Sequence, residues 1–217
     1  MNIDKLYING TDIQSTYGLY LKWRTLSAPV VKSNYKTVIG MQGDADLTES
    51  LGDVFYENRT LNLGMKHPAS EWQSDYDGML NNYHGKDVRI SFGNDTGWYW
   101  SGRISIGEYS AKSHDLSMTA SVFPFKRKTE QTVITESINA AGEESASTIQ
   151  LTGSRLKVSP KLTVTSEGSL TIKWGSKTAS LDAGEHYVDG LTIGAAGLTI
   201  KVWGVGTLKI EYRKGSL

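Results

Sequence analysis

The sequence has no cysteine and no long run of apolar residues. Without cysteine the chain has no disulfide, no thiolate zinc site and no cysteine nucleophile, which suits folding in a reducing cytosol. No apolar run approaches the length of a membrane span. The first residues, MNIDKLYINGTDIQ, carry acids in place of the apolar stretch of a secretory signal. We therefore expect a protein that is made in the cytoplasm and does not insert into a membrane.

An excess of charge of either sign is also missing. The chain has 23 Lys and Arg residues against 23 Asp and Glu residues, so its formal net charge is +0 at pH 7. Without a basic excess, no long-range field draws the protein to nucleic acid or to an anionic membrane. We expect no sequence-specific nucleic-acid partner.

Signatures of catalysis and of metal binding are scarce. The four histidines are far apart in the chain, and none has a second histidine at ligand spacing. The segment Asp44-Ala-Asp46 is a fragment of a calcium loop without the remaining ligands, which favours a solvated acidic loop. Neither a phosphate-binding Gly-rich loop nor a Gly-x-Ser-x-Gly elbow is present. A glycosidase-type carboxylate pair meets only in space, so the sequence does not test it. We expect no enzyme, no cofactor and no metal site.

Short strands dominate residues 1–126, which we interpret as a first domain. Alternating apolar residues bounded by turn residues predict strands at 5–8, 18–24, 34–40, 54–65, 86–92, 98–100, 103–106 and 116–123. The segment 40–49 (GMQGDADLTE) has two glycines and several acids. We interpret it as an exposed loop or hairpin arm.

One amphipathic helix is predicted near 70–84. Steps of four, three and four residues place four large side chains on one helical face, namely Trp72, Tyr76, Met79 and Tyr83. Ser70 is a suitable N-cap, and Gly85 is a suitable residue to end the helix.

The composition changes after the first domain. Residues 127–149 are polar and small, which is typical of a linker or arm. Residues 150–217 show strands at 161–165, 169–174, 191–193, 198–203 and 207–212, with turns between them. This spacing predicts a small antiparallel β-sandwich.

The chain has six Trp and eleven Tyr, so its aromatic residues are candidates for binding. Trp98 and Trp100 share one face of a predicted strand, either as a sugar-stacking platform or as a buried face or subunit contact, and we favour packing. In the second domain, Trp174, Tyr187 and Trp203 are the candidate ligand or interface aromatics.

Several stretches of the first domain resemble one family. The run MLNNYHGKDVRISF at 79–92, the run NDTGWYWSGR at 94–103 and VFPFK at 122–126 are similar to the distal tail proteins of siphophages that infect Gram-positive hosts. The resemblance is specific over 70–126 and loose after 147. It marks as packing residues Trp72, Tyr76, Met79, Tyr83, Gly85, Trp98, Trp100, Gly102 and Arg103.

The resemblance implies a mainly β protein, with an α+β first domain that contains one helix and a C-terminal galectin-like antiparallel β-sandwich. It implies a hexameric ring of this chain at the virion tail, assembled in the host cytoplasm. The ring would join the tail tube to the tail-tip or baseplate proteins and to a receptor-binding protein. The alternative is a carbohydrate-binding module protein that recognises the host surface.

Overall fold

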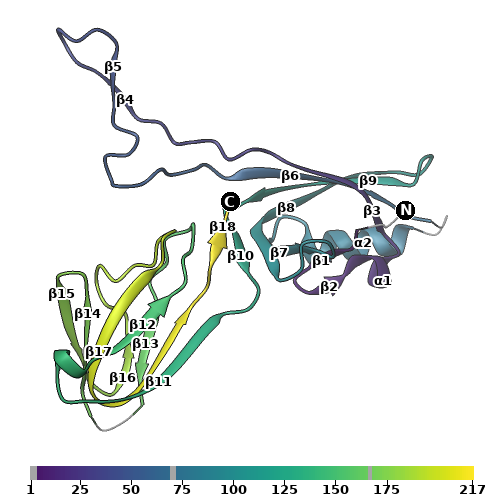
Figure 1. The fold of residues 1–217 in the computed structure, drawn as a ribbon. Coiled ribbons are helices and arrows are strands. Elements are labelled where there is room, and N and C mark those ends of the chain that lie inside the picture. Colours follow the sequence, from purple (N-terminus) through teal and green to yellow (C-terminus); the bar gives the residue numbers. More distant parts are fainter. Residues whose placement is uncertain (1–3, 69–71, 166–167) are drawn as a thin grey trace. The chain divides into compact units, whose positions relative to one another are not determined.

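The computed structural model describes residues 4–68, 72–165 and 168–217. Its contacts divide the chain into two compact units, Met1–Lys126 and Arg127–Leu217 (Figure 1). Each unit has its own hydrophobic core, so each is described by itself.

The first unit is built on an antiparallel sheet with the strand order β2-β1-β7-β8-β9-β6-β3. Two further strands, β4 and β5, pair only with each other. The strands are β1 (Leu6–Ile8), β2 (Thr11–Asp12), β3 (Tyr20–Leu26), β4 (Tyr35–Thr37), β5 (Asp44–Asp46), β6 (Arg59–Lys66), β7 (Asp87–Phe92), β8 (Trp98–Ser110) and β9 (Asp115–Val122). The helices are α1 (Ile13–Tyr17) and α2 (Gln73–Tyr83).

The core of the first unit follows the alternation of its strands. In β9, buried and exposed residues alternate along DLSMTASV, as expected for a strand with one face on the core. Helix α2 adds Met79 and Tyr83, which are both buried in the same core. The helix that the sequence predicted near 70–84 is therefore present, whereas the proposed cap Ser70 lies outside the described residues.

A second, short helix was not predicted. Asp12 caps α1 by accepting hydrogen bonds from the backbone N–H groups of Gln14 and Ser15 through Oδ1, at 3.0 and 3.2 Å. Five residues are too few for a helical period to show in a sequence, because they make little more than one turn. Among the described residues, this domain therefore has a second, short helix beside the predicted one.

The second unit is an antiparallel β-sandwich formed by a curled sheet. Its elements are β10 (Lys126–Lys128), β11 (Thr132–Ala140), the 3₁₀ helix η1 (Glu143–Ser145), β12 (Ser147–Leu151), β13 (Lys161–Val164), β14 (Leu170–Trp174), β15 (Lys177–Leu181), β16 (Gly184–His186), β17 (Leu198–Tyr212) and β18 (Gly215–Ser216). The short strands β10 and β18 pair with each other. The other seven form one sheet in which β17 is central.

The long strand β17 is what curls this sheet. Its first half pairs with β12 and β14, and its second half pairs with β11 and β13. The change falls near Gly204, whose φ of 117° lies in the region that glycine tolerates best. A side chain at Gly204 would also meet the carbonyl oxygen of Ser169 at 2.4 Å. The glycine lets one strand serve both halves of the sandwich.

Two predictions about strands are corrected, one for residues 127–149 and one for the long strands β8 and β17. Residues 127–149 do not form a linker, because β11 and β12 both pair with β17. Their exposed faces are polar and small, which made these edge strands look like a linker. In addition, the predicted pairs 98–100 with 103–106, and 198–203 with 207–212, are single strands β8 and β17. Glycines inside a long bent strand had been interpreted as turns.

Candidate assembly surface

The residues that the sequence marked near the helix form an aromatic cluster in the first unit. Trp72 stacks on Tyr109, with ring centroids 3.7 Å apart and planes at 22°. Tyr76 lies edge-on to Trp72 at 5.7 Å, and its hydroxyl donates to the carbonyl oxygen of Gly107. Tyr83 meets Tyr17 edge-on at 6.1 Å. Burial, together with the nearby Asp115 carboxylate, raises the pKa of the Tyr109 hydroxyl. These contacts hold α2 on the sheet.

The marked residues of the next strands also pack within the first unit. The Gly85 N–H donates to the carbonyl oxygen of Ile104 at 2.8 Å, and Arg103 donates to the Gly85 carbonyl oxygen. Trp100 is buried, with the Arg59 guanidinium carbon 4.9 Å from its ring centroid. A side chain at position 102 would lie 2.0 Å from the backbone oxygen of Ser121. Glycine there permits the close approach of β8 and β9.

Strand β8 is covered on both faces at its start. Tyr99 is buried on one face and Trp100 on the other, while Trp98 is half-buried beneath the Lys126 ammonium group at 5.2 Å. An open stacking platform needs an exposed ring face, whereas Tyr99 and Trp100 are both less than 10% exposed. The arrangement supports the packing interpretation of these aromatics over the sugar platform.

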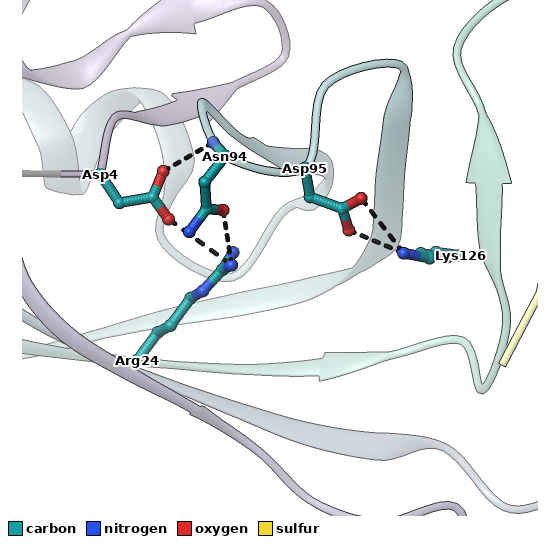
Figure 2. A network of polar contacts seen from close by, with 5 residues as sticks. All are labelled: Asp4, Arg24, Asn94, Asp95 and Lys126. Carbon is teal, nitrogen blue, oxygen red and sulfur yellow. Dashed lines mark hydrogen bonds and ion pairs between the residues drawn. The ribbon is translucent and has the colours of Figure 1, made fainter.

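A polar network fixes the turn between β7 and β8 (Figure 2). Arg24 on β3 donates to the side-chain oxygen of Asn94 at 2.7 Å, and lies 3.5 Å from the Asp4 carboxylate. The Asn94 N–H donates to Asp4 at 2.9 Å, and the Arg24 guanidinium lies over the ring of Phe92 at 3.7 Å. Strand β3 is at one end of the sheet order and β1 is near the other, so Arg24 links two distant strands.

The next residue of that turn is fixed as well. Lys126 holds both carboxylate oxygens of Asp95, at 2.8 and 3.1 Å (Figure 2). Family resemblance marked the segments 94–103 and 122–126 in the sequence, but sequence reasoning did not mark Asp4 or Arg24, nor the pairing of Lys126 with Asp95. The partners are up to 90 residues apart, and no short motif reveals such pairs.

Residues 27–58 between β3 and β6 form an arm that has no core of its own. None of these residues is buried. Backbone hydrogen bonds pair its two legs, from Ser27 to Thr60 at 2.9 Å and from Lys32 to Phe55 at 2.8 Å, and β4 and β5 pair near its tip (Figure 1). The sequence predicted an exposed loop or hairpin arm at 40–49, and the arm found is longer.

The arm carries an unusual set of exposed apolar side chains. The large apolar side chains exposed on the arm are those of Val30, Val31, Tyr35, Val38, Ile39, Met41, Leu47, Leu51 and Phe55. Ile39 is fully exposed and Leu51 is 80% exposed. A group of large apolar side chains exposed along one segment is typical of an interaction site. The arm is therefore the main candidate surface for assembly.

The first unit also has a groove of about 290 Å³ beside the strands that lead to the arm. Trp23 on β3 and Met65 on β6 line it, with Glu108 and Asp115 from β8 and β9. Asp115 accepts a hydrogen bond from Lys22 at 2.8 Å, which lowers the pKa of its carboxyl group. Trp23 is 49% exposed. Sequence reasoning did not mark this groove.

The candidate aromatics of the second unit are placed differently from one another. Trp174 is buried and donates through Nε1 to the carbonyl oxygen of Gly190 at 3.3 Å. Trp203 is half-buried against the second core. Tyr187, at 71% exposed, is the one of the three that faces solvent. Two of the three rings thus take part in packing.

Within residues 4–68, 72–165 and 168–217, no group of three or more His, Asp and Glu side chains is placed to hold a metal ion. No helix in the same part of the chain is both long enough and apolar enough to cross a membrane.

No protein-family model and no curated protein matches the sequence. The structure is similar to the crystal structure of SPP1 Dit (gp 19.1), described as a paradigm of the hub adsorption apparatus in phages that infect Gram-positive bacteria. The two share 13% identity, the match covers 100% of each chain, and the TM-score is 0.64. The resemblance that residues 70–126 indicated is confirmed at the level of the fold: over its whole length, this chain has the fold of a siphophage hub protein.

Proposed function

We propose that this chain is a structural, non-enzymatic component of a phage tail tip. In the proposal, six copies form a ring that joins the tail tube to the baseplate or adhesion device. The observation that carries the proposal is the full-length match, because both units of the chain have counterparts in one hub protein. A shared fold does not by itself assign a role, so the arm supplies the second argument.

The arm supports self-association. Its exposed apolar side chains contact water in the isolated chain, and covering one large aliphatic side chain contributes about 1.5–3 kcal/mol. Ring subunits meet head to tail, so each copy needs two different, complementary surfaces. The arm would be one surface and the sheet of the first unit would provide the other.

The second unit has a separate place in the proposal. We assign to it the role of the galectin-like sandwich that projects from the ring toward tail-tip, baseplate or receptor-binding proteins. A sandwich of this kind needs no catalytic group for such a role. Carbohydrate binding gains no specific support, since Trp174 and Trp203 take part in packing.

Electron microscopy of the purified full chain tests the proposal, with mass measured by light scattering. We expect rings with a central channel and a mass six times that of the 23.8 kDa chain. A strict monomer across the concentration series would contradict the proposal. If that monomer also bound a glycan, a carbohydrate-binding role would replace the structural one.

A further inference from the structure

The groove of the first unit is shaped by two β-bulges. On β3, the pairing with β6 shifts at Lys22, which is one residue more than the partner strand supplies. On β8, Gly107 and Glu108 together oppose a single residue of β9, Ser117. A bulge interrupts the alternation of faces along a strand and re-aims its side chains. Lys22 and the next residue, Trp23, are accordingly both exposed, and both line the groove together with Glu108.

Trp23 is the one exposed tryptophan of the six, since the other five are buried or half-buried. A side chain at Gly64 would come within 2.2 Å of its indole, so the indole occupies the space that a side chain at that position would fill. The partner of Gly64 on β9 is Ser117, another small residue. The small residues leave room beside the indole for the groove of about 290 Å³, which is near the lower end of the range of about 300–1,000 Å³ for small-molecule pockets.

Hydrogen-bond donors and acceptors are interleaved along the groove. Glu108 and Asp115 supply carboxylate acceptors, Lys22 supplies a donor, and Ser110 and Ser117 supply hydroxyls that can act as either. Lys22 and Asp115 pair at 2.8 Å, yet each side chain is 39% exposed and so stays accessible to a ligand. Among the described residues, the Glu108 carboxylate forms no ion pair.

This combination fits the chemistry of a sugar better than that of other ligands. Sugar hydroxyls both donate and accept hydrogen bonds, and the C–H face of a sugar ring packs on an aromatic ring. A phosphate would meet the two carboxylates. An apolar segment would remove the unpaired Glu108 carboxylate from water without a partner, and a cationic segment would lie beside the Lys22 ammonium group.

We propose that this groove binds a saccharide, with one sugar ring stacked on Trp23 and its hydroxyls hydrogen-bonded to Glu108 and to the Lys22–Asp115 pair. The inference goes beyond the proposed tail role and does not depend on the ring, because the groove lies within the first unit of a single copy. It places a sugar site in the first unit, whereas the sequence offered the aromatics of the second domain as candidates.

Isothermal titration calorimetry of the full chain tests for the site. The probes are three neutral trisaccharides that differ in sugar and linkage, namely maltotriose, cellotriose and chitotriose. We expect saturable binding of at least one probe at one site per chain, with a dissociation constant of about 1 mM or tighter. The absence of binding for all three probes would overturn the proposal.

Variants then locate the site. Trp23→Ala is expected to weaken binding about tenfold, because it removes the stacking ring, and Trp23→Phe is expected to recover part of that loss. Glu108→Ala is expected to weaken binding about threefold to tenfold, because it removes an acceptor. The matched control is Tyr187→Ala, which removes the exposed aromatic residue of the second unit and is expected to leave binding unchanged. Circular dichroism verifies that each variant is folded. A loss in Tyr187→Ala with unchanged binding in folded Trp23→Ala would overturn the groove as the site.

Hydroxyl-radical footprinting of the unmodified chain gives an independent measurement. The bound trisaccharide is expected to protect Trp23 from oxidation and to leave the oxidation of Tyr187 unchanged. Equal oxidation of Trp23 with and without a saturating trisaccharide would overturn the proposal.

These measurements separate the saccharide site from the proposed function. Rings that bind none of the probes would retain the ring and overturn the site. Binding that depends on Trp23 in a chain that stays monomeric would retain the site and overturn the ring.

Discussion

Apolar residues have two different environments in strand β6 and in the arm that connects β3 to β6. In the sheet, Leu61, Leu63 and Met65 are at most 1% exposed and belong to the core of the first unit. In the arm that connects the same strands, Ile39 is fully exposed and Leu51 is 80% exposed. Apolar residues serve the fold in the first region. In the second region, side chains such as Ile39 and Leu51 remain exposed to water in the isolated chain.

The largest expected effect on stability comes from a substitution in the core, compared with one in the arm. Met79→Ala removes a fully buried side chain and leaves a cavity, so we expect a loss of about 2–5 kcal/mol in the free energy of unfolding. Ile39→Ala in the arm should change the unfolding free energy of the monomer by no more than about 0.5 kcal/mol while weakening assembly. Urea denaturation below the assembly concentration measures both. Equal losses would show that the arm belongs to the fold of the single chain.

The next largest effect on stability is expected from replacing a glycine in the sheet. Gly102→Ala places a carbon 2.0 Å from the backbone oxygen of Ser121, so β8 and β9 must separate, at a cost of about 1–3 kcal/mol. Gly142→Ala is the matched control, because a side chain there meets no atom within 4 Å. Thermal unfolding of the two variants measures the difference. A Gly102→Ala variant as stable as the control would contradict the close approach of the two strands.

The polar network should contribute less than the core. Arg24→Ala removes the hydrogen bond to Asn94, the ion pair with Asp4 and the contact with Phe92, so we expect a loss of about 1.5–3 kcal/mol. Lys22→Ala, on the same strand, removes an ion pair whose two side chains are each 39% exposed, and should cost no more than about 1 kcal/mol. Chemical denaturation measures the loss in unfolding free energy of each variant, and we expect the larger loss for Arg24→Ala. The reverse order would contradict the structural role of Arg24.

The smallest effect depends on pH. The hydrogen bond from Lys5 and those from the start of α1 hold the pKa of the Asp12 carboxyl group below its ordinary value of 3.8. The folded state therefore favours the ionised form, and this stabilisation is present above that value and lost as the pH falls through the lower folded pKa. Asp12→Asn should flatten the acid limb of the stability curve. An unchanged acid limb in that variant would contradict the assignment.

The sequence predicted most of what depends on local periodicity. The steps between Trp72 and Tyr83 located α2, and alternation located most strands. It did not predict that β8 and β17 are continuous, because Gly102 and Gly204 have the same appearance in a bent strand as in a turn. It also interpreted β11 and β12 as a linker, because an edge strand of a small sandwich needs few large residues.

The candidate site was predicted less well than the fold. Segment 40–49 was marked as a possible arm, but its apolar neighbours Val38 and Leu51 were not recognised as exposed. The groove depends on Trp23 lying over Gly64, two residues that are 41 positions apart in the sequence. The Arg24 network likewise depends on how the strands are ordered in the sheet. Such relations follow from strand pairing, which a single sequence does not specify.

The central claim is that the arm drives assembly of an otherwise complete fold. Light scattering of the wild-type chain and of a variant in which Val38, Ile39 and Met41 are all changed to Ser tests it most directly, with circular dichroism to verify the fold. We predict that the wild type reaches the mass of a closed ring as its concentration rises, while the folded variant stays monomeric. A folded variant that assembles as readily as the wild type would contradict the claim.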